Sequence, residues 1–321
     1  MFKSAHVQTL WGPRWRKLPV VIRALESAPL SDGDHCWLHW AGPDAKNARA
    51  IVIVLHGLSG SSDSHYVVGL QHRLAQQKVA SVAVNFRGAA GRANNRARTY
   101  HSGETGDLND IVSQLHQRFP RARLLPVGYS LGGSRLLNYL AEGGHPAITA
   151  AAAVCVPIDL AACAERLNQG FSRVYRNHLI SELLSSYRDK LPHLEAVAPQ
   201  EAKKLSSLYD FSKENFNDIT TFRDYDRTII CPLFGFADPD DYYNRCSAKP
   251  KLVKIKTPTL LIQADDDPFM TPATLPTMVE LGDAVTLQVR NGGHVGFIDG
   301  LPFRPRYWLE ERISAYFGEW F

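Results

Sequence analysis

The chain has 321 residues, of which 45% are apolar and 21% charged, and its net charge is +4. That length buries a sizeable core and suits one α/β domain with an insertion as well as two domains. The small net charge and the lack of a dense Lys/Arg run argue against a nucleic-acid partner. Five irregularly spaced cysteines indicate reduced thiols, not a disulfide framework. Neither a signal peptide nor a bilayer-length apolar run is visible, so we expect a cytoplasmic protein without a stable membrane anchor.

Short apolar runs recur along the chain, with helix-length segments between them. The runs predicted to be strands are Ala50–Leu55, Val79–Asn85, Leu124–Val127, Ile148–Val156, Thr259–Ala264 and Val285–Val289. The helical spacing of apolar residues predicts helices at Tyr66–Gln77, Asp107–Phe119, Leu131–Glu142 and Pro302–Phe321. Uninterrupted apolar strands are typical of a parallel sheet covered on both faces. We therefore predict a doubly wound, mostly parallel α/β sheet, with an antiparallel leading edge formed by Val20–Leu25 and Cys36–Trp40.

Three positions need a separate interpretation. Pro126 falls inside a predicted central strand, where it removes a ladder hydrogen bond. The basic stretch Arg87–Arg98 is interleaved with Gly, Ala and Asn and is interpreted as a solvated loop. Arg135, on the helix after the third core strand, is interpreted as a surface or capping charge.

The regular alternation stops between residues 157 and 256. This stretch is richer in charge and in Tyr, Phe and Asn, and begins helically at Leu160–Asn168 and Ser181–Leu194. Its aromatic content is too high for a disordered linker. We predict an inserted, largely helical cap at 157–256, with residues 1–156 and 257–321 forming the core.

A Gly-x-Ser-x-Gly element spans residues 128–132, between a predicted strand and a predicted helix. At such a turn the serine, here Ser130, lies on a strained elbow above the N-terminus of the helix. Glycines are needed on either side because a Cβ would collide across so tight a turn. A five-residue motif with only three specified positions recurs by chance. The prediction that Ser130 is a nucleophile therefore depends on the strand–turn–helix context.

A serine nucleophile needs a base, and the base needs an orienting carboxylate. The run Asp265–Asp267 directly follows the strand at 259–264, and we choose Asp267 because it stands just before an apolar turn at 268–270. His294 lies just past the strand at 285–289. Both therefore sit at carboxyl ends of predicted parallel strands, in the order Ser, acid, His. Asp266 is the alternative acid. The triple Asp at 265–267 also suggests a metal cluster, but adjacent side chains diverge and no second ligand set is evident, so we expect neither a metal nor a cofactor.

The oxyanion that forms during acyl transfer needs preorganised N–H donors. Leu131, the residue after the nucleophile, is expected to supply one. The other is expected from the loop after the first core strand, with Leu58 N–H as the donor. His56, which opens that loop, is expected to brace it by a hydrogen bond.

The motifs together resemble the YheT-type α/β-hydrolases over nearly the whole chain. The resemblance is carried by residues 6–9, 56–63, 85–88, 100–105, 128–133, 221–224, 241–247, 266–269 and 292–297. It implies a Ser–Asp–His triad at Ser130, Asp267 and His294. Related eukaryotic members are acyl-ester hydrolases, phospholipases or alcohol acyltransferases of medium-chain acyl groups. This chain has Ser134 where many relatives carry Asn.

The favoured hypothesis is a serine esterase for short- to medium-chain acyl esters. The partner is then a small-molecule ester, and the acyl group passes through Ser130. An alcohol O-acyltransferase with the same triad is the alternative, and a non-catalytic binding protein on the same fold is the least favoured. The sequence leaves the oligomeric state open.

Overall fold

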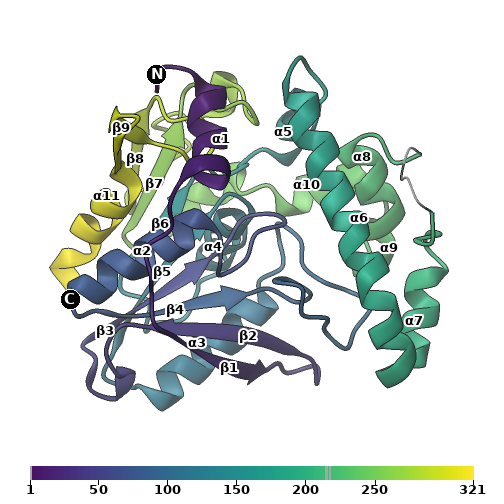
Figure 1. The fold of residues 1–321 in the computed structure, drawn as a ribbon, viewed down its shortest axis with the longest axis horizontal. Coiled ribbons are helices and arrows are strands. Elements are labelled where there is room, and N and C mark those ends of the chain that lie inside the picture. Colours follow the sequence, from purple (N-terminus) through teal and green to yellow (C-terminus); the bar gives the residue numbers. More distant parts are fainter. Residues whose placement is uncertain (1, 214–215, 217) are drawn as a thin grey trace.

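A computed structural model describes residues 2–213, 216 and 218–321. Its centre is an eight-stranded sheet in the order β1-β2-β4-β3-β5-β6-β7-β8. β2 pairs antiparallel with β1 and β4, and the other neighbours pair in parallel. Figure 1 shows this sheet on one side of the molecule and a group of helices on the other. The predicted mostly parallel sheet with an antiparallel leading edge is confirmed.

The strands follow the apolar runs, with small shifts at their ends. They are β1 Arg23–Pro29, β2 His35–Ala41, β3 Ala50–Leu55, β4 Ala80–Asn85, β5 Arg123–Tyr129, β6 Ala151–Val154, β7 Thr259–Ala264, β8 Val285–Arg290, β9 Ile298–Leu301 and β10 Arg304–Tyr307. β3, β4 and β7 are buried at every position, as uninterrupted apolar runs predict. β8 is only partly buried because it forms the edge of the sheet.

Helices cover both faces of the sheet. They are α1 Ala5–Trp15, α2 His65–Gln76, α3 Gly106–Arg118, α4 Leu131–Ala141, α5 Leu160–Arg166, α6 Ser172–Val197, α7 Pro199–Ser206, α8 Phe222–Tyr225, α9 Cys231–Phe234, α10 Pro239–Cys246 and α11 Trp308–Phe317. α3 and α4 pack on the face presented by alternate residues of β3. α2 and α11 pack on the opposite face. Because successive side chains of a strand point to opposite faces of the sheet, the core consists of two apolar layers.

The central strand β5 tolerates Pro126 because its pairing toward β6 is interrupted there. Leu124 lies opposite Ile148 and donates its N–H to the carbonyl just before that residue. The next pair is Val127 with Ala152, so the facing chain advances by one residue more than β5 does. The bulge removes the ladder position at which Pro126 would have to donate an N–H.

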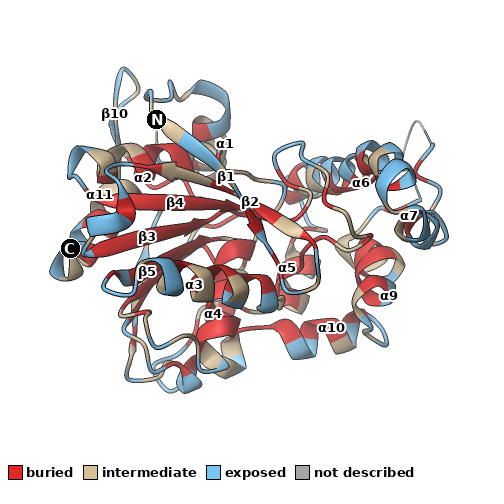
Figure 2. Cartoon of the chain, turned by 90° about the horizontal axis from the view of Figure 1, so that it is seen from below, coloured by how far each residue is buried: buried red, intermediate tan, exposed pale blue. Residues whose placement is uncertain are grey.

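The segment between β6 and β7 is helical and has its own apolar cluster. It holds α5 to α10, which Figure 1 shows as a teal-to-green group beside the sheet. Figure 2 shows the inward sides of these helices buried and their outward sides exposed. α6 runs over Ser172–Val197, well beyond the helix predicted at 181–194. The cluster includes Leu183, Leu184, Tyr187, Phe211, Ile229 and Tyr243.

Two terminal features differ from the prediction. β9 and β10 form an antiparallel hairpin whose second strand, Arg304–Tyr307, lies inside the helix predicted at Pro302–Phe321, and α11 begins only at Trp308. At the other end α1 is a helix that the pattern does not predict, because Gly12 and Pro13 interrupt it. None of the helices in the described part of the chain combines the length and the apolar character needed to cross a membrane.

The interpretation of Arg87–Arg98 as a solvated loop is wrong at its first residue. Arg87 is 2% exposed and forms ion pairs with Asp32, Asp34 and Asp107 at 2.6–2.9 Å. Bonds to Arg87 hold the pKa of Asp32 at about 2, against the raising effect of partial burial. A fully buried guanidinium is stable only when paired in this way. This network ties the chain before β2 to the loop after β4.

Arg135 is likewise buried, not a surface or capping charge. It is 1% exposed, pairs with the carboxylate of Glu104 and donates from Nε to the Glu104 carbonyl at 2.8 Å. Its guanidinium lies 4.1 Å from the ring centre of Phe86. Arg135 therefore anchors the loop before α3 to the helix that follows Ser130.

Candidate active site

Ser130 lies on a strained turn between β5 and α4. Its φ of 51° is in the left-handed region. A Cβ at Gly128 would come within 2.4 Å of the Gly132 carbonyl oxygen, and one at Gly132 within 2.4 Å of the His56 carbonyl oxygen. Both glycines are therefore required for the turn, as the sequence pattern indicates.

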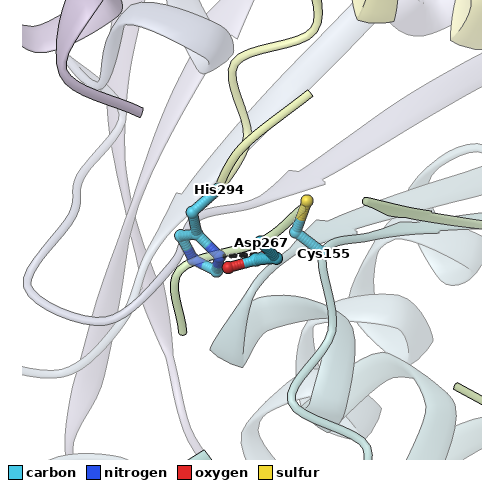
Figure 3. A group of neighbouring side chains, drawn as sticks. All are labelled: Cys155, Asp267 and His294. Atoms are coloured by element: carbon cyan, nitrogen blue, oxygen red, sulfur yellow. Dashed lines mark hydrogen bonds and ion pairs between the residues drawn. The ribbon is translucent and has the colours of Figure 1, made fainter. Parts of the chain in front are cut away.

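The three predicted catalytic side chains form one hydrogen-bonded chain. Ser130 Oγ lies 3.0 Å from His294 Nε2, and His294 Nδ1 lies 2.8 Å from Asp267 Oδ2. Figure 3 shows the imidazole of His294 facing the Asp267 carboxylate. The Asp267 side chain is 1% exposed and that of His294 is 11% exposed. Phe269 stacks on the imidazole at 4.0 Å with nearly parallel planes, which fixes the ring.

The three consecutive aspartates have separate partners. Asp267 faces His294, while Asp266 Oδ1 accepts the N–H groups of Gly292 and Gly293, each at 2.8 Å. Asp265 accepts from the side chain of Asn291 at 2.9 Å. Asp266, the alternative acid, therefore supports the loop that carries the histidine and does not contact its ring.

Helix α1 braces the histidine loop, a role that the sequence patterns did not suggest. Thr9 Oγ1 accepts the His294 N–H at 2.9 Å. Gln8 bonds both the N–H and the carbonyl of Ile298, at 2.7 and 3.1 Å. His6 Nδ1 lies 2.9 Å from the hydroxyl of Tyr175 in α6. The motif at residues 6–9, noted only as part of the resemblance, was the available signal.

Cys155 packs behind the triad at the end of β6. Its side chain is fully buried, and its Sγ accepts the Val295 N–H at 3.3 Å and lies 3.6 Å from the Gly293 carbonyl. Gly293 and Val295 are the residues directly before and after His294. Donor atoms of Cys155, Asp267 and His294 lie within 4.8 Å of one another (Figure 3). Burial, reinforced by the Asp267 charge, raises the pKa of the thiol well above its ordinary value, so we interpret it as a hydrogen-bonding group and not as a metal ligand.

The residues predicted to form the oxyanion site lie close to Ser130 and line the same cavity. His56 accepts the Phe86 N–H on Nε2 at 3.1 Å and lies 2.7 Å from the Gly57 carbonyl through Nδ1, so it braces the loop. The N–H groups of Gly57 and Ser59 donate to the hydroxyls of Tyr66 and Tyr100, respectively. The N–H of Leu58, between them, has no such partner among the described residues. Leu131 opens α4, so its N–H belongs to the unpaired first turn of the helix.

A cavity of about 550 Å³ opens at the triad. Its walls include the end of α1, the loop after β3 and the helices between β6 and β7, and further lining comes from residues 100–102, 130–131, 269–270 and 294–295. Most of the lining is apolar or aromatic, including Leu160, Leu167, Tyr175, Leu179, Phe222 and Ile230. Asp226 also lines it, fully buried and bonded to the Tyr243 hydroxyl at 2.6 Å, and burial raises the pKa of this carboxyl to about 7. The volume lies in the range of small-molecule sites, roughly 300–1,000 Å³.

Comparison with known proteins identifies the family. Residues 50–301 match the model of the α/β hydrolase fold. Escherichia coli YheT, which is named as an esterase, is 36% identical over 97% of this chain and 89% of its own length. The chain belongs to the YheT-type branch of the α/β-hydrolase family. A second relative is the medium-chain fatty acid ethyl ester synthase/esterase 2 of Saccharomyces cerevisiae. It is 29% identical over 83% of this chain and 61% of its own length.

Solved structures share the architecture. A Pyrococcus furiosus esterase superposes with a TM-score of 0.58 over 94% of this chain and 92% of its own. Its sequence is only 17% identical, so this likeness bears on the fold alone.

Proposed function

We propose that this α/β-hydrolase is a serine-dependent carboxylic ester hydrolase for short- to medium-chain acyl esters. The observation that carries the proposal is the hydrogen-bonded chain from Ser130 through His294 to Asp267, which opens into a mostly apolar cavity. The esterase name of the E. coli relative supports the ester-hydrolase part. The insertion at 157–256 is proposed to act as a cap, because its helices supply much of the cavity wall.

The proposed reaction has two halves. Ser130 Oγ attacks the ester carbonyl while its proton passes to His294 Nε2, and the alcohol leaves with that proton. Asp267 holds the imidazole in the tautomer that has its free Nε2 toward the serine. The N–H groups of Leu58 and Leu131 stabilise the oxyanion, and removing one such donor costs about 3 kcal/mol in comparable enzymes. Water then attacks the acyl-enzyme, with His294 as base, and releases the acid.

A chain-length series tests the substrate class. The hydrolysis of p-nitrophenyl esters from acetate to dodecanoate is measured with the wild type and with Ser130→Ala. We expect kcat/KM to peak at a short or intermediate chain and to fall by at least about 10⁴-fold in the variant. Comparable activity in the two proteins contradicts the proposal.

Alcohol acyl transfer is the second candidate, supported by the ester-synthase name of the yeast relative and by the apolar cavity. An alcohol would then replace water in the second half of the reaction. Ester formation and hydrolysis are compared at rising ethanol concentrations. An acyltransferase forms ester in preference to acid at low ethanol, whereas a hydrolase forms mainly acid.

A further inference from the structure

The segment after α1 places large apolar side chains in solvent. We define the arm as residues 13–22, which are the last three residues of α1 and the connection from α1 to β1. The fractional exposures along it are 60% for Trp15, 45% for Leu18, 90% for Val20 and 92% for Ile22. Isolated exposed apolar residues are ordinary, but four within eight residues of one segment are a concentration of the kind found at interaction surfaces.

The arm is also purely cationic. It contains Arg14, Arg16 and Lys17 and no acidic residue. Arg16 points inward, where it pairs with Glu310 at 2.6 Å and its guanidinium lies over the ring of Tyr307. Arg14 and Lys17 are exposed, and neither forms an ion pair with any residue that the structure describes. Two free cations are therefore interleaved with the exposed apolar side chains.

The arm lies at the opening of the cavity. Pro13, Arg14 and Leu18 line the cavity and are exposed to solvent as well. The start of α6, whose Tyr175 lines the same cavity, has a similar composition: Phe171 is 51% and Val174 54% exposed, and the neighbouring Arg173 is exposed. The ring of His6 in α1 lies 4.7 Å from that of Phe171, so α1 and the start of α6 are in contact.

We propose that the arm docks the protein on an anionic lipid bilayer surface. Its apolar side chains enter the boundary between headgroups and acyl chains, and Arg14 and Lys17 pair with lipid phosphates. Charge complementarity favours this occupant over a second copy of the chain. A two-fold contact between two arms would bring their cations together. The docking does not depend on the proposed catalytic function.

Vesicle sedimentation tests the proposal with the full chain. The probes are phosphatidylcholine vesicles with and without one quarter phosphatidylglycerol. We expect binding to the anionic vesicles only, weakened by high salt because screening shortens the reach of charge. Arg14→Glu/Lys17→Glu is expected to lower the partition coefficient at least about 10-fold, since each basic residue near such a surface contributes about 5-fold. Val20→Ser/Ile22→Ser is expected to lower it by a similar factor, because it removes two of the apolar side chains that enter the boundary.

Matched controls come from the far side of the insertion. Lys203→Glu/Lys204→Glu changes two exposed lysines in α7, which Figures 1 and 2 both show far from α1. Val197→Ser replaces a valine of α6 that is 54% exposed. These variants are expected to bind as the wild type does, and thermal melting of every variant checks its fold. The proposal is overturned by a lack of binding to anionic vesicles, by equal binding of the arm variants, or by a concentration-dependent dimer that Val20→Ser/Ile22→Ser abolishes without vesicle binding in the wild type.

Discussion

The carboxyl-terminal ends of the strands, here called the sheet edge, carry Ser130. They and the helical insertion beside them are stabilised by different interactions. At the sheet edge the main chain sets the geometry: Ser130, Cys155 and Val295 all have left-handed φ values, 51°, 47° and 60°. Each lies at a strand end or in the histidine loop and donates its main-chain N–H: Ser130 to the Val154 carbonyl, Cys155 to the Ile262 carbonyl, and Val295 to Cys155 Sγ. Such strain persists only where the surroundings over-determine it.

In the insertion, side-chain packing and side-chain hydrogen bonds set the geometry. An aromatic and aliphatic cluster fills it, and buried titratable groups connect it to the core. Lys190 of α6 donates to the carbonyls of Ala97 and Arg98 at 3.1 and 3.3 Å, and burial lowers the pKa of its ammonium to about 7. The difference indicates that the main chain fixes the geometry around Ser130, whereas side chains of the insertion form much of the cavity wall. Four substitutions separate the two parts.

The largest effect is expected from Asp267→Asn at the sheet edge. The amide leaves the geometry nearly unchanged but favours the wrong imidazole tautomer, so kcat should fall about 10⁴-fold. Asp266→Asn is the matched control, since its oxygen still accepts from the histidine loop. We expect it to cost less than about 10-fold. Steady-state kinetics measure both, and equal losses contradict the assignment of the acid.

Arg87→Ala tests the buried network next to the site. Removing it leaves the carboxylates of Asp32, Asp34 and Asp107 without their shared cation, so the free energy of unfolding should fall by about 5 kcal/mol. Urea denaturation measures the loss. Arg92→Ala, an exposed arginine of the same loop, should change stability by less than about 1 kcal/mol. Similar losses in the two variants contradict the network.

Asp226→Asn tests a buried charge of the insertion. The folded pKa of about 7 exceeds the ordinary value of 3.8, so the folded state binds the proton more tightly. This contribution to stability is full below about pH 4 and is lost as the pH rises to about 7. Over that range the wild type should lose about 3 kcal/mol more than the variant, which has no group to titrate there. Denaturation at pH 4, 5.5 and 7 measures the difference, and parallel pH profiles contradict it.

The smallest effect is expected from Cys155→Ala, which removes the acceptor for the Val295 N–H. One weak hydrogen bond behind the histidine is worth about 1 kcal/mol, so kcat should fall about 5-fold with KM unchanged. Cys155→Ser keeps an acceptor and should recover part of the rate. Cys231→Ala, a buried cysteine of the insertion, is the control. A change in KM alone, or an equal effect of both alanine variants, contradicts a positioning role.

The sheet and the positions of the proposed triad residues can be predicted from sequence because local patterns encode them. Uninterrupted apolar runs mark β3 and β7, and the glycines around Ser130 and before His294 mark tight turns. The apolar turn after Asp267 favours it over its neighbours, and Asp267 is the aspartate whose carboxylate lies 2.8 Å from His294 Nδ1.

What the sequence did not predict depends on contacts between distant segments. Arg87 is buried because Asp32, Asp34 and Asp107 converge on it, and no local pattern shows that convergence. The β9–β10 hairpin has strands of only four residues each, which are too short for a strand pattern to be distinguished from the start of a helix. Helix α1 depends on its contacts with the histidine loop, since it contains a glycine and a proline.

Labelling with a fluorophosphonate tests the central claim most directly, because the probe reacts only with a serine activated by a base and an oxyanion site. Intact-mass spectrometry of the folded protein should show one adduct, and peptide mapping should place it on Ser130. Ser130→Ala should remain unlabelled, and Asp267→Asn should label much more slowly. A folded wild type that takes up no label, or takes it up equally without Ser130, contradicts the account.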